Sequence, residues 1–157
     1  MAADDLDRIM QVMQGAFDPE FGEAWTRRQV EDALLLGNSH YLLAGPDGEN
    51  LFEDRDNDFA AAGFALSRTA LDEEELLLFA VLPQYRRRGV GTRLLRRYVE
   101  TAQARGIQRI LLEVRRGNSA EGLYRSQGFE PIGMRPNYYR TLQGLRIDAI
   151  TFALALN

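Results

Sequence analysis

Apolar residues recur at helical spacing in the first part of the chain. Residues 6–17 predict an amphipathic helix, because apolar side chains repeat every three or four positions: Leu6, Ile9, Met10, Met13 and Phe17. Residues 26–37 predict a second helix, since Thr26 and Gln29 have the spacing of a capping box and Gly37 follows the last apolar position. The N-terminal region is therefore expected to be helical.

Shorter apolar runs between turn residues predict the strands of a sheet, at 40–44, 59–67, 107–114, 129–134 and 148–156. Residues 76–82, LLLFAVL, are apolar on both faces, which is typical of a strand buried in the middle of a sheet. The polar residues 49–58 predict a loop, and the acidic run LDEEE at 71–75 predicts a turn.

The centre of the chain has the order strand, tight loop, helix, strand. Residues 92–106 predict a helix with one apolar stripe, which ends at Gly106. A helix between two strands makes a crossover, so the strands before and after it are expected to be parallel. A short helix over residues 118–128 follows, with Asn118 as its cap.

These elements predict the fold class α/β (α+β), with a mixed central sheet of about six to seven strands flanked by helices on both faces. The chain has 157 residues, of which 45% are hydrophobic and 27% charged. This length and composition are typical of one globular domain, so a single domain is expected over residues 1–157.

Composition excludes several classes of protein. The net charge of −4 argues against general nucleic-acid binding. No apolar run approaches the roughly 20 residues that cross a bilayer, and the acidic N-terminus lacks the pattern of a secretory signal. With no cysteine and a single histidine, His40, no disulfide and no metal site are expected. The prediction is a cytoplasmic protein that binds neither membrane nor nucleic acid directly.

The segment YRRRGVG at residues 85–91 joins the buried strand to the central helix. Amides at a helix N-terminus have no internal acceptors, and the helix dipole adds about half a positive charge there. Gly89 and Gly91 let the backbone approach a ligand, and Arg86 and Arg88 can add bidentate contacts. This arrangement favours a pyrophosphate. The P-loop and Rossmann motifs are excluded by the spacing and by the absence of lysine. A solvated arginine turn or a nucleic-acid patch stays open as an alternative.

The motif R-x-x-G-x-G formed by Arg86, Gly89 and Gly91 resembles the coenzyme A loop of the GCN5-related N-acetyltransferase (GNAT) superfamily. The stretch LLEVRRGNSAEGLYRSQGF resembles the second conserved region of that superfamily. The segments RPNYYR and DAI near the C-terminus resemble its bacterial ribosomal-protein-alanine N-acetyltransferases. The resemblance runs from about Glu73 to Ile150. It implies acetyl-CoA as co-substrate, no metal, and a peptide N-terminus as acceptor; in the subfamily this is the N-terminal alanine of a small-subunit ribosomal protein.

The resemblance also implies which residues bind the cofactor. Where the two parallel strands separate, backbone amides near Val81 lose their partners and can face the acetyl carbonyl. Asn118 is implied to contact the cofactor, although Tyr124 follows it by six positions where seven are usual in the subfamily. The full predicted set is Phe79, Ala80, Val81, Arg86, Arg87, Arg88, Gly89, Val90, Gly91, Thr92 and Asn118.

Acetyl transfer to an amine requires a base for the amine and a proton donor for the leaving thiolate. Alternation in the strand puts Glu113 on one face with Leu111 and Arg115, and the resemblance implies that Glu113 is the base. A salt bridge to Arg115 or Arg109 is the alternative. Tyr124 is the candidate acid, because the matching tyrosine of the superfamily lies beside the thioester sulfur; a core aromatic residue is its alternative.

The acceptor site is predicted from four aromatic residues. Tyr138 and Tyr139 are candidates to line a slot for a peptide N-terminus, and Phe21 and Trp25 close it from the other side. The acidic run 72–75 would attract a basic peptide, or is a solvated turn. The segment FDPEFGEAW replaces the shorter FPW of the subfamily.

The leading hypothesis is an acetyl-CoA-dependent N-acetyltransferase that modifies the α-amine of a protein or peptide. A superfamily member acting on a small-molecule amine, and a non-catalytic acyl-CoA-binding module, are the alternatives. The presence of both Glu113 and Tyr124 favours an enzyme.

Overall fold

A computed structural model describes residues 3–47 and 61–156. Its elements follow in the order α1 (Ala3–Ala16), η1 (Pro19–Phe21), α2 (Arg27–Leu35), β1 (Ser39–Ala44), β2 (Gly63–Ala70), β3 (Glu73–Val81), η2 (Pro83–Tyr85), α3 (Val90–Ala104), β4 (Arg109–Arg115), α4 (Ala120–Ser126), β5 (Glu130–Arg140) and β6 (Arg146–Ala155). The predicted polar loop at 49–58 lies outside the described residues, as do the first residues of the strand predicted at 59–67.

The described strands form one mixed sheet in the order β1-β2-β3-β4-β6-β5. The pair β3 and β4 is parallel, and every other neighbouring pair is antiparallel. The predicted crossover through α3 and the predicted fold class are therefore confirmed. The apolar strand β3 lies inside the sheet, as its lack of a polar face predicts.

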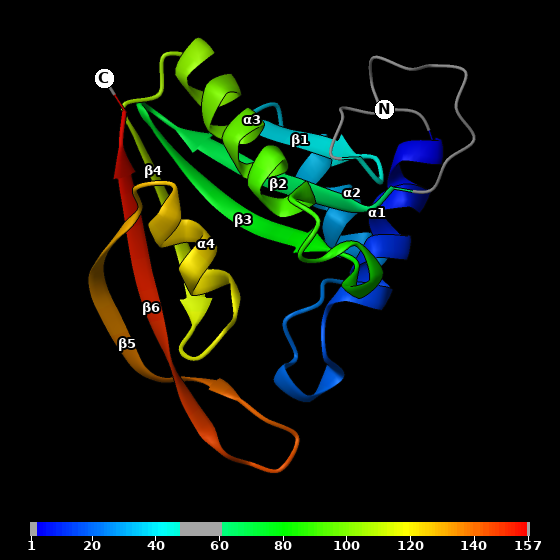
Figure 1. Ribbon diagram of the computed structural model, residues 1–157, viewed down its shortest axis with the longest axis vertical. Helices are drawn as coiled ribbons and strands as arrows, with labels where there is room; N and C mark the ends of the chain where they lie inside the picture. Colours follow the sequence, from blue (N-terminus) through cyan, green and yellow to red (C-terminus); the bar gives the residue numbers. More distant parts are fainter. Residues whose placement is uncertain (1–2, 48–60, 157) are drawn as a thin grey trace.

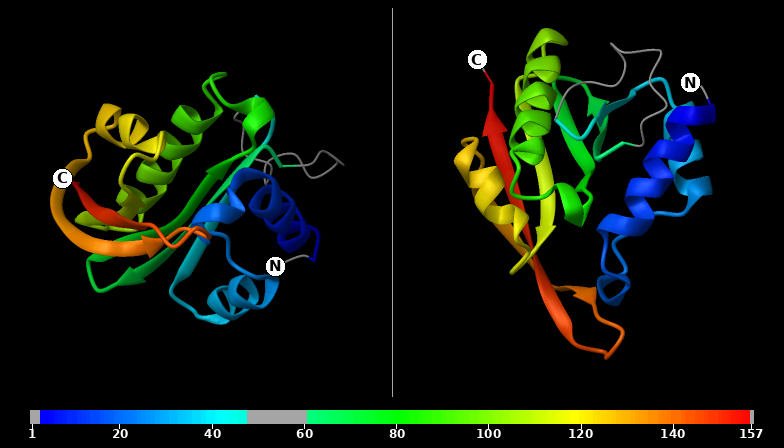
Figure 2. Two further views of the ribbon diagram at one scale, coloured as in Figure 1. Left: turned by 90° about the horizontal axis from the view of Figure 1, so that it is seen from below. Right: turned by 45° about the vertical axis from the view of Figure 1, so that its right-hand side comes forward.

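Helices cover both faces of the sheet (Figures 1 and 2). On one face α1 and α2 bury an apolar cluster with the strands, and Ile9, Val30 and Phe64 are all fully enclosed in it. On the other face α3 and α4 cover a second cluster that contains Leu94 and Phe152. The helical stripes seen in the sequence thus pack on the sheet, where burial of apolar surface stabilises the fold.

The parallel strands β3 and β4 separate halfway along their length. Their pairing runs from Glu73 and Arg109 to Leu76 and Leu112. Beyond that point β3 continues to Val81 while still paired with β2, and β4 continues to Arg115 paired with β6. The edges of the two strands that face each other beyond Leu76 therefore have backbone groups without strand partners, as the sequence predicted.

The turn predicted over LDEEE is wrong, because the turn in the structure is shorter. Only two residues, at positions 71 and 72, form the turn, and the three glutamates belong to β3. Each of these carboxylates faces an arginine of a neighbouring element. Glu73 pairs with Arg109, Glu74 with Arg105 and Glu75 with Arg68. Since their charges are neutralised by these partners, the strand tolerates three consecutive acids.

The C-terminal hairpin is longer than predicted, because the segment RPNYYR continues β5 to Arg140. Its register shifts between Arg135 and Tyr139, where Asn137 has a positive φ of 57° and its amide donates to the Asp148 carboxylate at 2.9 Å. A bulge of this kind lets a strand change direction without ending. At the tip, the Leu142 amide donates to the Glu20 carbonyl at 3.0 Å, which joins the hairpin to η1.

None of the helices in the described part of the chain combines the length and apolar character that a bilayer crossing demands.

Candidate active site

The loop between β3 and α3 contains left-handed backbone at Arg87, with φ of 64°, and at Gly89, with φ of 81°. Gly89 is the N-cap of α3, and the first helical hydrogen bond runs from the Arg93 amide to the Gly89 carbonyl at 3.0 Å. The amides of residues 90–92 precede this bond, so they have no helical acceptor and can donate to a ligand.

Gly91 lies where the first turn of α3 approaches two other elements. A Cβ at this position would lie 3.3 Å from Leu123 Cδ2 and 3.6 Å from Val81 Cγ2. A larger residue would push the helix away from β3 and α4, so the sequence motif is required for packing as well as for access to the backbone.

Arg86 connects the loop to two other elements. Its Nε donates to the Val81 carbonyl at 2.9 Å and its Nη2 donates to the Ala16 carbonyl at 2.8 Å. The guanidinium therefore binds the carboxyl end of β3 to the end of α1. Its contact with a pyrophosphate stays a prediction, and this structural role was not evident from the sequence.

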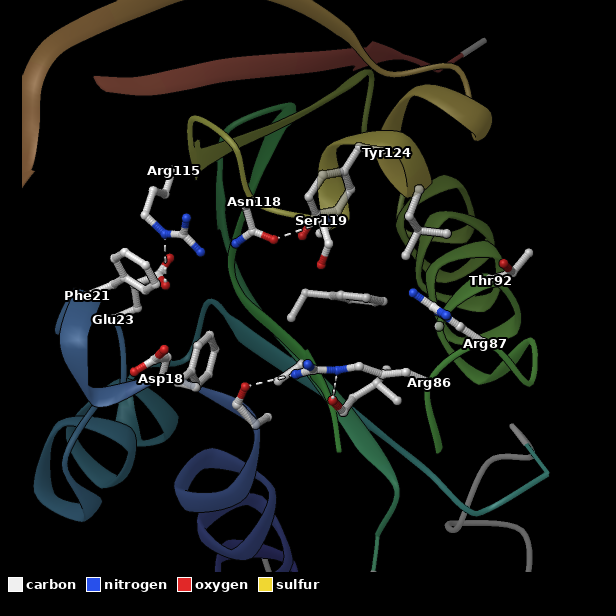
Figure 3. Close-up of a pocket in the computed structure, with 18 of the residues that line it drawn as sticks. Asp18, Phe21, Glu23, Arg86, Arg87, Thr92, Arg115, Asn118, Ser119 and Tyr124 are labelled. Atoms are coloured by element: carbon white, nitrogen blue, oxygen red, sulfur yellow. Dashed lines mark hydrogen bonds and ion pairs between the residues drawn. The ribbon is translucent and has the colours of Figure 1, made fainter. Parts of the chain in front are cut away.

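A first cavity of about 790 Å³ lies over the carboxyl half of β3. Figure 3 shows Arg87 and Thr92 at one end of it, Glu23 and Arg115 at the other, and Tyr124 between them. The predicted cofactor residues that line it are Phe79, Ala80, Val81, Arg86, Arg87, Gly89, Gly91, Thr92 and Asn118.

Two predicted cofactor residues have side chains outside the lining of the first cavity. Arg88 is exposed, and its carbonyl accepts a hydrogen bond from Arg93 at 3.1 Å. Val90 is fully buried in the core. Val90 is one of the first three residues of α3, so its amide remains a candidate donor to a ligand even though its side chain is not.

A second cavity of about 520 Å³ lies where β3 and β4 have separated, and it is lined by parts of both strands. It contains the candidate base Glu113 and three of the four predicted acceptor residues, Trp25, Tyr138 and Tyr139. The fourth, Phe21, lines the first cavity instead. The residues that line both cavities are Phe17, Glu23, Phe79, Asn118 and Tyr124. The two cavities therefore meet at the gap between the parallel strands.

Glu113 extends from β4 into the lining of the second cavity, and 22% of its side chain is exposed. Its Oε2 lies 3.3 Å from Nε of Arg135 on β5 and makes no hydrogen bond within the described residues. The partners expected from the sequence, Arg109 and Arg115, pair with other carboxylates. The ion pair of Glu113 thus leaves the carboxylate able to accept a proton or a hydrogen bond from a ligand.

The Tyr124 side chain lines both cavities and is also part of the core. Its ring packs edge-on against Phe79 at 6.1 Å and Phe129 at 5.8 Å between centroids. Burial raises the pKa of the phenol, and the nearby charge of Glu23 raises it further. The hydroxyl is therefore protonated at neutral pH and available as a donor. The two interpretations left open by the sequence, an acid and a core aromatic residue, are thus compatible.

The N-cap of α4 is Ser119 rather than the predicted Asn118, although the Asn118 side chain still binds the first turn of the helix. Its Oδ1 accepts from the Ala120 amide at 2.8 Å. Gly117, with φ of 87°, provides the left-handed backbone before it. The residue also lines both cavities, so the shorter spacing to Tyr124 has not moved it away from the site.

Tyr138 and Tyr139 follow the β5 bulge and pack edge to face, with ring centroids 5.1 Å apart. Burial, with the charges of Glu23 and Glu113, raises the pKa of Tyr139 to about 12. The two tyrosines and Trp25 line the second cavity from distant parts of the chain.

Glu23 is a residue that sequence reasoning missed. It lies between η1 and α2, in the segment FGEAW, and its carboxylate is 3.5 Å from Nε of Arg115. The Arg115 guanidinium lies 3.6 Å from the centre of the Phe21 ring. The available indication was the segment itself, because FGEAW has a carboxylate two positions before the predicted acceptor residue Trp25.

Two parallel strands separate beside a glycine-containing loop, and two cavities meet at the gap between them. This arrangement agrees with the acetyltransferase class that the sequence resembles. The chain belongs to the Acetyltransferase (GNAT) family, whose model matches residues 6–129. The resemblance noted in the sequence is thereby confirmed.

Named relatives narrow the comparison further. The [ribosomal protein bS18]-alanine N-acetyltransferase of Salmonella typhimurium (strain LT2) is 42% identical over 138 residues, which cover 85% of this chain and 90% of the relative. The protein of the same name in Escherichia coli (strain K12) is 42% identical over 97 residues. That match spans 61% of this chain and only 65% of the relative's length.

A solved structure agrees with these relatives. The crystal structure of the ribosomal-protein-S18-alanine N-acetyltransferase from Escherichia coli superposes with a TM-score of 0.80 at 30% identity. The match covers 100% of this chain and 91% of that one.

Proposed function

We propose that this protein is an acetyl-CoA-dependent N-acetyltransferase that modifies the N-terminal α-amine of a protein or peptide. The observation that carries the proposal is the meeting of the two cavities at Phe79, Asn118 and Tyr124. Two substrates that enter from opposite sides would react there, since transfer without a covalent enzyme intermediate needs both in contact. The family and the names of the relatives support the same reaction.

The first cavity fits coenzyme A. Left-handed backbone at Gly89, the helical amides of residues 90–92 and the Arg87 side chain gather at one end, as a pyrophosphate requires. From there the cavity follows Phe79, Ala80 and Val81, whose strand edge is unpaired on the β4 side. Backbone amides on this edge are proposed to bind the pantetheine arm and the acetyl carbonyl, which becomes an oxyanion during transfer.

Glu113 is proposed as the base and Tyr124 as the acid. The α-ammonium loses a proton to Glu113, directly or through a water molecule, and the neutral nitrogen attacks the thioester carbonyl. The C–N bond forms, the C–S bond breaks, and the thiolate takes a proton from the Tyr124 hydroxyl. The second proton, which the nitrogen loses as it becomes an amide, returns the tyrosinate to its neutral form. Glu113 lines only the second cavity and Tyr124 lines both, which agrees with this division of roles.

The acceptor is proposed to be cationic and peptidic. The charged side chains that line the second cavity among the described residues are all carboxylates: Glu23, Glu75 and Glu113. They favour an ammonium group, while Trp25, Tyr138 and Tyr139 provide aromatic walls for the first residues of a chain. The relatives are named for the alanine of a ribosomal protein, so an alanine N-terminus of a small-subunit ribosomal protein is the acceptor we propose.

Residues 1–157 are proposed to act as one N-acetyltransferase domain, because the residues that line the two cavities are spread along the chain from Ala16 to Tyr139. Acetyl-CoA and newly made ribosomal proteins share the bacterial cytoplasm, which is the compartment we propose for the reaction.

The test measures release of coenzyme A thiol from acetyl-CoA with a panel of acceptors. The panel contains a basic peptide that starts with alanine, the same peptide with a blocked α-amine, a polyamine and an aminoglycoside. We expect turnover with the first peptide and none with its blocked form. Turnover on the polyamine or aminoglycoside alone would replace the proposal with a small-amine acetyltransferase, and binding of acetyl-CoA without any turnover would indicate a binding module.

A further inference from the structure

Glu23 occupies a defined position although it lies outside helices and strands. Only 14% of its side chain is exposed, and it lines both cavities. The turn before it is held from two sides. Arg115 of β4 stacks on Phe21, and the hairpin residue Leu142 donates to the Glu20 carbonyl. The carboxylate is therefore presented to the point where the cavities meet by contacts that do not depend on a ligand.

The ion pair with Arg115 does not satisfy this carboxylate. The distance of 3.5 Å between Nε of Arg115 and Oε1 of Glu23 is longer than a charge-assisted hydrogen bond. The same Nε is buried and has no hydrogen-bond acceptor among the described residues. By comparison, the cavity carboxylate Glu75 is 2.8 Å from Nη2 of Arg68. Glu23 thus retains acceptor capacity that a cationic ligand can use.

The groups that face Glu23 come from several elements. Burial raises the pKa of Glu23 by more than Arg115 lowers it, and the charge of Asp18 raises it further. Tyr124 of α4 and Tyr139 of β5 are close enough for the charge of Glu23 to raise their own pKa. A second positive charge beside this carboxylate would therefore be attracted, since the protein alone does not compensate for its burial.

We propose that Glu23 binds the α-ammonium of the incoming peptide and holds it at the junction of the cavities until Glu113 removes a proton. This inference rests on the proposed function and adds the residue that recognises the acceptor's charge. Glu113 lies on β4 at the wall of the same cavity, and Tyr139 is influenced by the charges of both carboxylates. Once the proton has passed to Glu113, the amine is neutral and its attraction to Glu23 is lost, so it can move to the thioester.

The test compares Glu23→Gln with Glu20→Gln, which removes the same charge from the same turn but lies outside both cavity linings. For Glu23→Gln we expect the KM for the alanine-starting peptide to rise about 10- to 100-fold, the effect of losing one charge-assisted hydrogen bond. The KM for acetyl-CoA stays unchanged. Glu20→Gln leaves both KM values at wild-type levels.

Thermal unfolding separates this role from a structural one. Because the pKa of Glu23 is raised in the folded protein, its contribution to stability is fully present below the ordinary pKa of glutamate and is lost as pH rises through the raised value. Above the raised value the charged side chain is unfavourable, so in that range Glu23→Gln is expected to keep or raise the Tm while peptide binding weakens.

An unchanged peptide KM in Glu23→Gln would overturn the inference. A lower Tm together with a higher acetyl-CoA KM would also overturn it, because Glu23 would then only hold the loop to Arg115. If the wild-type protein modifies a polyamine and not the peptide, the proposed function fails. The inference about Glu23 is then tested by comparing the KM of the same two variants for the polyamine, because a polyamine also carries an ammonium. If no acceptor is modified, calorimetry measures the affinity of the peptide for the protein bound to coenzyme A, and this affinity replaces the KM. Equal affinities in the two variants would contradict the inference.

Discussion

Replacing Tyr124 with phenylalanine separates the proposed role of the hydroxyl as an acid from the role of the ring in the core. The ring is 6% exposed and contacts three aromatic residues, Phe79, Phe129 and Phe152, at centroid distances of 5.8 to 6.4 Å. Phenylalanine keeps all three contacts and removes only the hydroxyl. The change in the free energy of unfolding is therefore expected to stay within about 1 kcal/mol, whereas truncation to alanine would cost about 3–5 kcal/mol.

The expected catalytic effect is much larger than the effect on stability. Proton transfer by a positioned side chain contributes about 10²–10⁴-fold to a rate, which corresponds to about 3–5 kcal/mol of activation free energy. A thiolate leaves more easily than an alkoxide, so we expect Tyr124→Phe to lower kcat by about a hundredfold, at the bottom of this range. The raised pKa of Tyr124 keeps the wild-type hydroxyl protonated throughout the assay at neutral pH.

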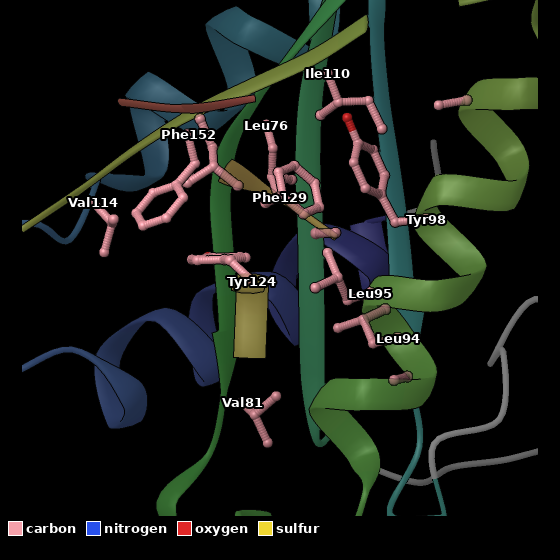
Figure 4. Close-up of a cluster of buried hydrophobic side chains, with 14 of the residues drawn as sticks. Leu76, Val81, Leu94, Leu95, Tyr98, Ile110, Val114, Tyr124, Phe129 and Phe152 are labelled. Carbon is pink, nitrogen blue, oxygen red and sulfur yellow. The ribbon is translucent and has the colours of Figure 1, made fainter. Parts of the chain in front are cut away.

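The assay follows thiol release at saturating acetyl-CoA and peptide, with thermal unfolding measured in parallel. Tyr98→Phe is the matched control, because Tyr98 belongs to the same apolar cluster as Tyr124 (Figure 4). Tyr98 is 2% exposed and lines neither cavity. We expect the control to keep the wild-type kcat. Wild-type kcat in Tyr124→Phe would refute the role of the hydroxyl and leave Tyr124 as a core residue alone.

Three further predictions concern the base, the loop and the sheet. Glu113→Gln is expected to lower kcat by about 10²–10⁴-fold, while the affinity for coenzyme A measured by calorimetry stays unchanged. A kcat equal to that of the wild type would exclude Glu113 as the base. Gly89→Glu adds negative charge at a φ of 81° and a Cβ that would lie 2.8 Å from the Arg93 guanidinium. It should therefore abolish coenzyme A binding in the same calorimetric measurement, and an unaltered affinity would contradict the assignment of this loop to coenzyme A. Glu74→Gln breaks a buried ion pair with Arg105, whose Nη2 is 2.7 Å from Glu74 Oε2. It should lower the free energy of unfolding, measured in urea, by about 3 kcal/mol. A urea unfolding midpoint equal to that of the wild type would show that the pair contributes nothing.

Local sequence patterns predicted most of the described fold. The capping box at Thr26 and Gln29 forms as expected, and the alternation in β4 buries Ile110, Leu112 and Val114 on one face while Glu113 lies on the other. These features depend on neighbours within a few positions, so periodicity and capping rules describe them well. The error at LDEEE has a different origin. Consecutive acids indicate a turn unless arginines from other elements neutralise them, and those arginines are up to 36 positions away.

The sequence by itself determined the family, the order of the central elements and the types of residue near the reaction. The tertiary structure decided how those residues divide between two cavities and which partners they have. Arg86 binds the carbonyl of Ala16, 70 positions away, and Glu113 pairs with Arg135 across the sheet. Glu23 reaches the junction of the cavities because Arg115 stacks on Phe21. Contacts of this kind form only when burial brings distant segments together, and no periodicity or spacing within the chain records which segments will meet.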